Sequence, residues 1–195
     1  MKQKAGVILT VFTAIAIAVV LTAGGCTKKE EAKQETTNIT ETEVATEKNW
    51  TNSTARGDIE DKAISGKIND KSVAIKNVQV EEWDGEYSWS FSNQDVETTC
   101  GVIVGNDAVN FSSKILQEGT FEKKMDEEVE FEDYHAYYHY QQENDTPMSV
   151  NVDWSAKVVI NKIDKENKKV SGWAKFDFTD EKTAIAGSFE ADLCE

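Results

Sequence analysis

Short segments in which apolar and polar residues alternate cover the chain from about residue 62 to its end. Tyr87, Trp89 and Phe91 alternate with serines, and the segment 174–178 repeats this pattern with alanine and phenylalanine. Alternation over four to eight residues, rich in aromatic and β-branched side chains, is typical of half-buried β-strands. We therefore predict strands whose aromatic side chains point to a common core.

The same pattern predicts strands at 63–68, 72–80, 87–91, 101–104, 108–111, 132–140, 150–163, 174–178 and 185–193. Turn sequences separate several of them, namely Asn69-Asp70, Gly105-Asn106-Asp107, the charged segment 164–169 and Asp180-Glu181-Lys182. Similar glycine-containing segments near Gly66, Gly172 and Gly187 indicate places where strand backbones approach closely or a bulge bends the sheet. The only helix we expect is a short one at 113–117. Residues 62–195 are thus predicted to form one all-β domain, an antiparallel β-sandwich or a barrel-like sheet.

The first 25 residues have the pattern of a secretory signal. Lys2 and Lys4 precede an apolar run from Ala5 to Ala23, which ends at Gly24, Gly25 and Cys26. These last residues resemble the lipobox of bacterial lipoproteins, although Ala23 stands where that family usually has leucine. The resemblance implies that residues 1–25 are removed and that Cys26 receives the lipid. The alternative is an uncleaved transmembrane anchor, because the run is nearly long enough to span a bilayer. Both interpretations place the rest of the chain outside the cytoplasm.

Residues 26–61 are expected to form a disordered acidic tether after the lipidated cysteine. This segment is rich in Thr, Glu, Lys and Asn and has too few apolar side chains to offset the entropy of ordering. Trp50 is the exception, either as the first residue that docks on the domain or as a lone exposed aromatic. Arg56-Gly57-Asp58 matches the integrin-recognition tripeptide, but matches of three residues are common by chance, and we interpret it as a glycine turn before the domain.

Charge argues against several classes of function. The chain has 21 basic and 36 acidic residues, a net charge of −15, and Arg56 is its only arginine. Such a balance opposes binding to nucleic acid and to anionic head groups, and a domain without arginine lacks the bidentate group that grips phosphate. We find no P-loop and no Gly-x-Ser-x-Gly motif, and we predict no cofactor.

Two cysteines remain when Cys26 carries the lipid. In an extracytoplasmic compartment, Cys100 and Cys194 predict a disulfide bond. A catalytic thiol is the alternative, and it would need a base beside one of the two.

His135 and His139 lie in a tyrosine-rich segment that favours a strand. Four residues apart on a strand, the two imidazoles lie about 13 Å from each other, so they cannot share one metal ion, and we predict no metal site. Period-two alternation puts Tyr138 and its even-numbered neighbours on one face, and the histidines on the other. We predict that one face is core and that the rings of the other face cover the sheet; the alternative is that this second face is a stacking surface for a sugar or a peptide. The candidate ligand residues are Tyr134, His135, Tyr137 and His139.

A run of carboxylates precedes this strand, comprising Asp126, Glu127, Glu128, Glu130, Glu132 and Asp133. It offers oxygen ligands for calcium but lacks the glycine and the spacing of an EF-hand loop, so we interpret it as a solvated strand face. Paired carboxylates would also suit a glycosidase, but sequence does not show which two lie at the required separation.

The chain also resembles β-rich lipoproteins of bacteria that open with a Ser-Gly-Lys-Ile-Asn-like strand, here residues 65–69. They close with Gly-Ser-Phe-Glu-Ala and a final cysteine, here residues 187–191 and Cys194. The resemblance implies a fold and a compartment, with no activity. We therefore expect a lipid-anchored protein of the cell envelope, on the outer membrane or cell surface in a Gram-negative cell, with a non-enzymatic binding or scaffolding domain. The alternative is an envelope hydrolase or a calcium-dependent carbohydrate-binding module that uses acidic residues.

Overall fold

The computed structural model describes residues 48–95, 100 and 107–194. The chain divides into two units, residues 1–43 and 44–195. The first unit lies outside the described residues, and so do the predicted signal peptide, Cys26, the predicted strand at 101–104 and residues 105 and 106 of its turn. The structure below is that of the second unit.

The described residues hold twelve strands and no helix. The strands are β1 (Trp50–Thr51), β2 (Ser65–Ile68), β3 (Lys71–Ala74), β4 (Asn77–Trp83), β5 (Glu86–Ser92), β6 (Ala108–Ser113), β7 (Gly119–Lys123), β8 (Tyr134–Gln141), β9 (Pro147–Val150), β10 (Trp154–Asp164), β11 (Lys169–Phe178) and β12 (Ala184–Cys194). The all-β prediction is confirmed. The short helix predicted at 113–117 is wrong, because β6 continues to Ser113 and residues 114–118 are irregular. β1, β7 and β9 were not predicted, and the strands predicted as continuous at 72–80 and 150–163 are interrupted at residues 75–76 and 151–153.

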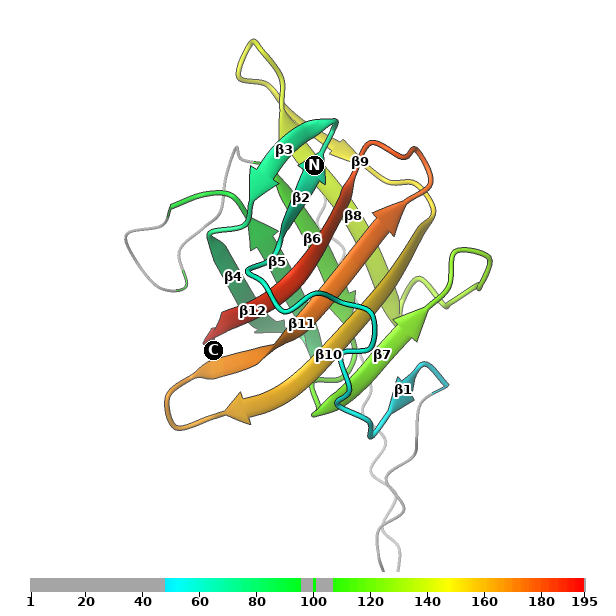
Figure 1. Cartoon of the computed structure of the whole chain (residues 1–195), viewed down its shortest axis with the longest axis vertical. Coiled ribbons are helices and arrows are strands. Elements are labelled where there is room, and N and C mark those ends of the chain that lie inside the picture. The colour runs from blue at the N-terminus through cyan, green and yellow to red at the C-terminus, as the bar shows by residue number, and fades with distance from the viewer. Residues whose placement is uncertain (1–47, 96–99, 101–106, 195) are drawn as a thin grey trace, which may run out of the picture. The chain divides into compact units, whose positions relative to one another are not determined.

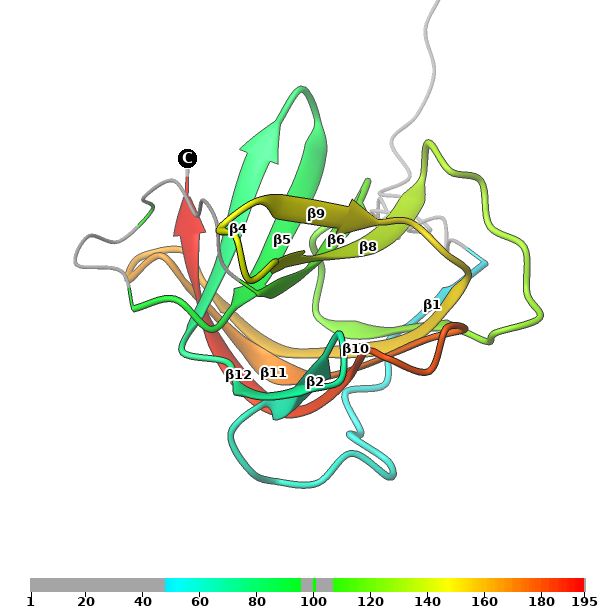
Figure 2. The same cartoon turned by 90° about the horizontal axis from the view of Figure 1, so that it is seen from above.

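All twelve strands belong to one curled sheet. Its order is β1-β7-β10-β11-β12-β4-β5-β6-β8-β9, with β2 paired to β12 and β3 paired to β2 (Figure 1). Neighbouring strands are antiparallel except β12 and β4, which pair in parallel. The sheet bends there, so that β10 and β11 face β5, β6 and β8 across the core (Figure 2). The predicted barrel-like sheet is therefore confirmed, with one parallel pair in place of a wholly antiparallel arrangement.

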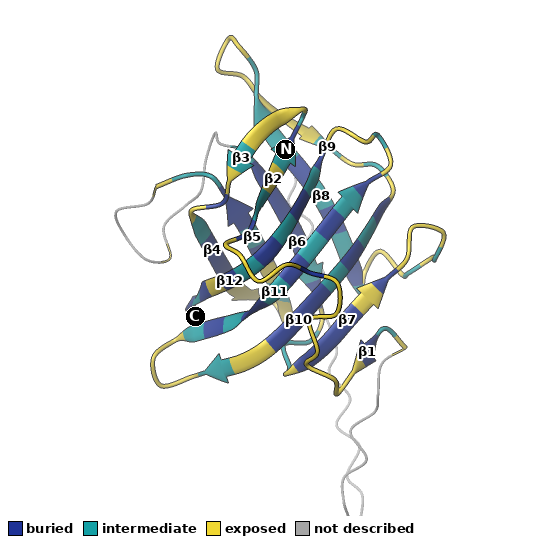
Figure 3. Cartoon of the chain, viewed as in Figure 1, coloured by how far each residue is buried: buried dark blue, intermediate teal, exposed yellow. Residues whose placement is uncertain are grey.

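Aromatic side chains from both halves of the sheet fill the core. Phe91 lies 5.3 Å from Phe176, and Phe111 lies 5.2 Å from Phe121, measured between ring centroids. Buried and partly exposed residues alternate along the whole of β11 (Figure 3). Each fully buried aromatic side chain contributes about 1.5–3 kcal/mol, so the alternation seen in the sequence is what closes the two halves on each other.

Turn residues and glycines act as the sequence indicated. Asn69 and Asp70 have φ angles of 47° and 63°, as a tight β2–β3 hairpin requires. A Cβ atom on Gly172 would lie 1.9 Å from the carbonyl oxygen of Val159, opposite a register shift between Ile160 and Lys162. The predicted close backbone approach at a bulge is confirmed at this position.

Residues 48–63, here called the N-terminal strap, cross the outer surface of β10, β11 and β12 (Figure 1). β1 pairs with the edge strand β7, and Trp50 and Ile59 are only 3% and 2% exposed. The predicted disordered tether at 26–61 is therefore wrong for residues 48–61. Two buried apolar side chains and backbone bonds such as that from Glu122 N to Asn49 O (3.0 Å) offset the ordering entropy. Of the two interpretations of Trp50, docking is confirmed.

Cys100 and Cys194 form the predicted disulfide, with Cα atoms 5.5 Å apart. The bond joins the segment between β5 and β6 to the last strand, across a sequence separation of 94 residues. In the chain-entropy model a loop of this length stabilises the fold by about 4–5 kcal/mol.

Candidate functional site

A cleft of about 660 Å³ opens where the loop 124–133 joins β7 to β8. The segment 151–153, which precedes β10, forms its other wall, and both segments lie at the same side of the sheet (Figure 2). We call it the acidic cleft, because five carboxylate side chains line it. These are Asp126, Glu127, Glu128, Glu130 and Asp153.

The predicted solvated strand face for the acidic run is wrong, because residues 124–133 form an irregular loop with turns. Glu127 is the fixed member of the run. It accepts hydrogen bonds from the Lys124 backbone (3.3 Å) and from Asn49 Nδ2 (3.1 Å), and Lys48 lies 3.6 Å away. The hydrogen bond from the Lys124 backbone, helped by Asn49 and Lys48, lowers the pKa of Glu127. The other four carboxylates form no ion pair within the described part of the chain.

Lys123 forms the floor of the cleft and is only 6% exposed. Its Nζ donates hydrogen bonds to the carbonyl oxygens of Trp154 (2.6 Å) and Lys124 (3.2 Å), and lies 4.8 Å from the centroid of the Trp154 ring. Burial lowers the pKa of Lys123, and the negative charges of Asp153 and the loop carboxylates oppose this shift. The side chain is thus held by carbonyl oxygens and a ring face, and the carboxylates act on it only from a distance.

A row of three rings leads out of the cleft along the outer face of β8. Phe131 is 65% exposed, its ring centroid lies 4.2 Å from that of His135, and His135 lies 5.5 Å from Tyr137. Burial lowers the pKa of His135, so its imidazole is uncharged at neutral pH. The row therefore presents an exposed aromatic surface without positive charge.

The structure brings together only part of the predicted ligand surface. Tyr134 lines the cleft but is only 5% exposed, and its ring centroid lies 4.6 Å from that of Phe121 in the core. Its place on the even-numbered face of β8 explains this. His139 shares the outer face with His135 and Tyr137 but does not line the cleft, and its Nδ1 is 3.0 Å from Asn110 Nδ2. Burial lowers the pKa of His139, and Asp107 partly opposes the shift.

Within residues 48–95, 100 and 107–194 no group of three or more His, Cys, Asp or Glu side chains is placed to hold a metal ion. The carboxylates of the acidic cleft therefore line an open wall without converging on a point. What this arrangement offers is a field of negative charge beside exposed rings.

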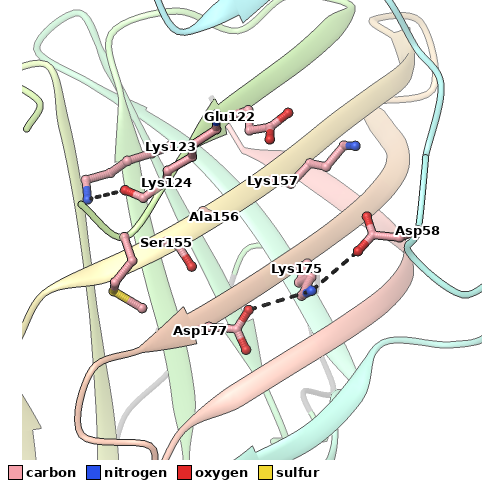
Figure 4. Close-up of a pocket in the computed structure, with 10 residues that line it drawn as sticks. Asp58, Glu122, Lys123, Lys124, Ser155, Ala156, Lys157, Lys175 and Asp177 are labelled. Carbon is pink, nitrogen blue, oxygen red and sulfur yellow. Dashed lines mark hydrogen bonds and ion pairs between the residues drawn. The ribbon is translucent and has the colours of Figure 1, made fainter. Parts of the chain in front are cut away.

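A second depression, which we call the strap-side depression, lies on the outer surface of β7, β10 and β11 next to the strap (Figure 4). Lys175 lies 3.5 Å from Asp58 and 3.9 Å from Asp177, so lysines and carboxylates pair there. The Arg56-Gly57-Asp58 tripeptide forms a turn at its rim, with Gly57 at φ 66° and the Ile59 amide donating to the Arg56 carbonyl (3.4 Å). The glycine-turn interpretation of the tripeptide is confirmed.

Sequence reasoning did not single out Lys123, Phe131, Asp153 or Trp154. The signal for Lys123 was its position two residues after Phe121, which puts it on the inward face of β7. Phe131 and Asp153 lie in segments without periodicity, where sequence gives no direction for a side chain.

No protein-family model, curated protein or solved structure matches this chain. Within the described residues, no helix has the length and apolar character needed to cross a membrane.

Proposed function

We propose that this protein is an exported lipoprotein, attached to the membrane through a lipid on Cys26, whose β-domain is a non-enzymatic binding module. The observation that carries the proposal is the Cys100–Cys194 disulfide. It accounts for both cysteines of the domain and is typical of an oxidising compartment. Cys26, directly after Gly24-Gly25, is then the one thiol left for lipid.

The acidic cleft supports the binding role. Its volume lies in the range of sites that hold small ligands or short peptide segments. Apart from Glu127, its carboxylates and the exposed Phe131 form no ion pair or side-chain hydrogen bond with the described part of the fold, and Tyr134 and Trp154 close the core beneath them. We propose this cleft as the ligand site of the domain.

Metabolic labelling with an alkyne fatty acid tests the anchor. The full-length protein should take up label, and Cys26→Ala should abolish it. The matched control is the double variant Cys100→Ser, Cys194→Ser, which keeps the lipobox and should be labelled like the unaltered chain. Label retained in Cys26→Ala would refute the lipoprotein proposal.

Alkylation of the mature protein tests the compartment. Without reductant no thiol should react, and after reduction two should. A reactive thiol before reduction would show that the disulfide does not form in the cell.

A further inference from the structure

The outer face of β4, β5, β6 and β8 carries the two most exposed large apolar side chains of the described residues. Trp83 is 75% exposed and Phe131 is 65% exposed. Trp83 ends β4, next to the Asp84-Gly85 turn of a hairpin that extends beyond the neighbouring strands (Figure 2). Phe131 lies at the other side of this face, where its ring packs on that of His135. One ligand can contact both rings only if it crosses β5 and β6.

A row of polar side chains lies between the two rings. Residues paired on neighbouring strands point to the same side of a sheet, and Trp83 shares this side because it follows Glu81 by two residues. The row across the four strands comprises Glu81, Ser88, Ser112 and His135. Three strand spacings separate β4 from β8, about 14 Å, which is comparable to the length of a short oligosaccharide.

The adjacent row on the same face contains polar groups that the fold leaves without partners. This row comprises Gln79, Ser90, Asn110 and Tyr137. Gln79 is only 8% exposed, yet its Nε2 atom has no hydrogen-bond partner in the part of the chain that the structure describes, and neither has Ser90 Oγ beside it. Because a buried polar group without a partner is costly, a bound molecule is expected to complete these two. They indicate a ligand on this face independently of the exposed rings.

The chemistry of this face fits an uncharged sugar. Serine hydroxyls and a glutamine amide both donate and accept hydrogen bonds, as sugar hydroxyls do. The C–H groups of a sugar ring pack on the negative face of an aromatic ring, which Trp83 and Phe131 provide. Exposed Glu81, Glu82 and Glu86 near the hairpin turn oppose an anionic ligand. An added peptide strand is disfavoured because β5 and β6 are already paired on both edges.

Building on the binding role proposed above, we propose that the domain binds a neutral oligosaccharide across the outer face of β4, β5, β6 and β8. The two ends of the sugar stack on Trp83 and on Phe131, which also lines the acidic cleft. The sugar hydroxyls bond to Ser88 and Ser112 and complete the amide of Gln79. The ligand site therefore begins at the cleft and extends along the sheet outside it.

The test is nuclear magnetic resonance on full-length, lipidated, isotope-labelled protein in a detergent without a sugar head group. Cellotetraose, mannotetraose, chitotetraose and laminaritetraose are the neutral probes, and glucose and tetragalacturonate are the controls. We expect at least one neutral probe to bind and to shift the amide signals of residues 86–90 and 110–113. Glucose should bind more weakly because it is too short to contact both rings, and the anionic tetragalacturonate should not bind.

Variants locate the site. Trp83→Ala should weaken binding of the neutral probe about tenfold, and Phe131→Ala about fivefold. Gln79→Leu should weaken it about threefold without lowering the melting temperature, because the Nε2 atom that it removes has no partner in the described residues. The matched control is Met148→Ala, which removes another exposed apolar side chain, on β9, and should leave the affinity unchanged.

Four outcomes would overturn the proposal: no binding of any neutral probe, glucose or tetragalacturonate binding as tightly, amide shifts confined to residues 124–133 and 151–153, or no greater loss in Trp83→Ala than in Met148→Ala. The third would leave the acidic cleft as the ligand site and remove only its extension along the sheet. None of these depends on lipid at Cys26, so the anchor and the ligand are tested separately.

Discussion

Lys123 lines both the strap-side depression and the acidic cleft. The two sites differ in how many of their carboxylates lie beside a lysine. In the depression, Lys157 stands directly opposite Glu122 on β7 and Lys175 on β11, and Asp58 and Asp177 lie near Lys175 (Figure 4). In the cleft, carboxylates outnumber cations five to one. Lysines and carboxylates are thus mixed in the depression, whereas carboxylates predominate in the cleft.

Aromatic residues divide in the same way. On the strap side, Trp50 is buried against Phe121, with ring centroids 5.9 Å apart. On the cleft side, Phe131 is left in solvent although His135 is close enough to stack on it. The strap therefore contributes a buried side chain to the core, whereas the cleft has an aromatic side chain that the fold leaves exposed to solvent.

The largest expected effect separates these two aromatic residues. Trp50→Ala should lower the free energy of unfolding by about 3–5 kcal/mol, because a buried ring is lost and a cavity remains. Phe131→Ala, the matched control, should change it by less than about 0.5 kcal/mol, because the side chain is already exposed. Chemical denaturation followed by tryptophan fluorescence measures the Phe131 variant, and circular dichroism measures both. Equal losses would show that the cleft loop is part of the stable core.

A glycine substitution is expected to detach the strap selectively. Gly119 has φ 140°, and a Cβ atom there would lie 2.3 Å from the Thr51 carbonyl oxygen. Gly119→Ala should therefore cost about 1–3 kcal/mol and raise hydrogen exchange in β1. Gly85→Ala is the control, because it has a positive φ of 82° but nothing within 4 Å. If Gly85→Ala raises exchange in β1 equally, crowding against the strap is not the cause.

Much of the fold could be predicted from alternation alone. The strands at 174–178 and 185–193 bury the residues that the pattern assigned to the core. At 87–91 Trp89 and Phe91 are buried as predicted, whereas Tyr87 is only half-buried. β1 was missed because two residues have no periodicity, and its order comes from Trp50 packing on Phe121, a contact between distant segments. The parallel β12–β4 pair is equally a property of the assembled sheet.

The candidate site could be predicted only in part. The acidic run and the odd-numbered face of β8 were visible in sequence, but nothing there indicated that segment 151–153 faces them. Tyr134 was assigned to the ligand surface although the alternation itself places it with Tyr138 on the core face. Local pattern fixes which face a strand residue takes, whereas the loops that build a cleft take their direction from tertiary packing.

A smaller effect is expected from pH. Burial lowers the pKa of His135 and His139 below the ordinary value of 6.5, so the unfolded chain binds protons that the folded chain does not. Stability should therefore fall as the pH drops through about 6.5 and level off below the folded-state pKa values, before the carboxylates titrate. In the double variant His135→Gln, His139→Gln, the melting temperature should depend less on pH between pH 7.5 and 5. If the melting temperature of the double variant still falls with pH as it does in the unaltered protein, groups other than these two histidines cause the pH dependence.

The smallest effect is expected at the ion pair that joins the strap to the depression. A backbone hydrogen bond and then the Lys175 ammonium lower the pKa of Asp58, but the carboxylate is fully exposed, and exposed pairs contribute little. Asp58→Asn should leave the melting temperature indistinguishable from that of Glu166→Gln, an exposed control. Its only expected trace is slightly faster amide exchange at residues 56–61. A loss comparable to that of Trp50→Ala would mean that charge, and not the buried Trp50 and Ile59, holds the strap in place, and the contrast between a packed strap side and an electrostatic cleft would no longer stand.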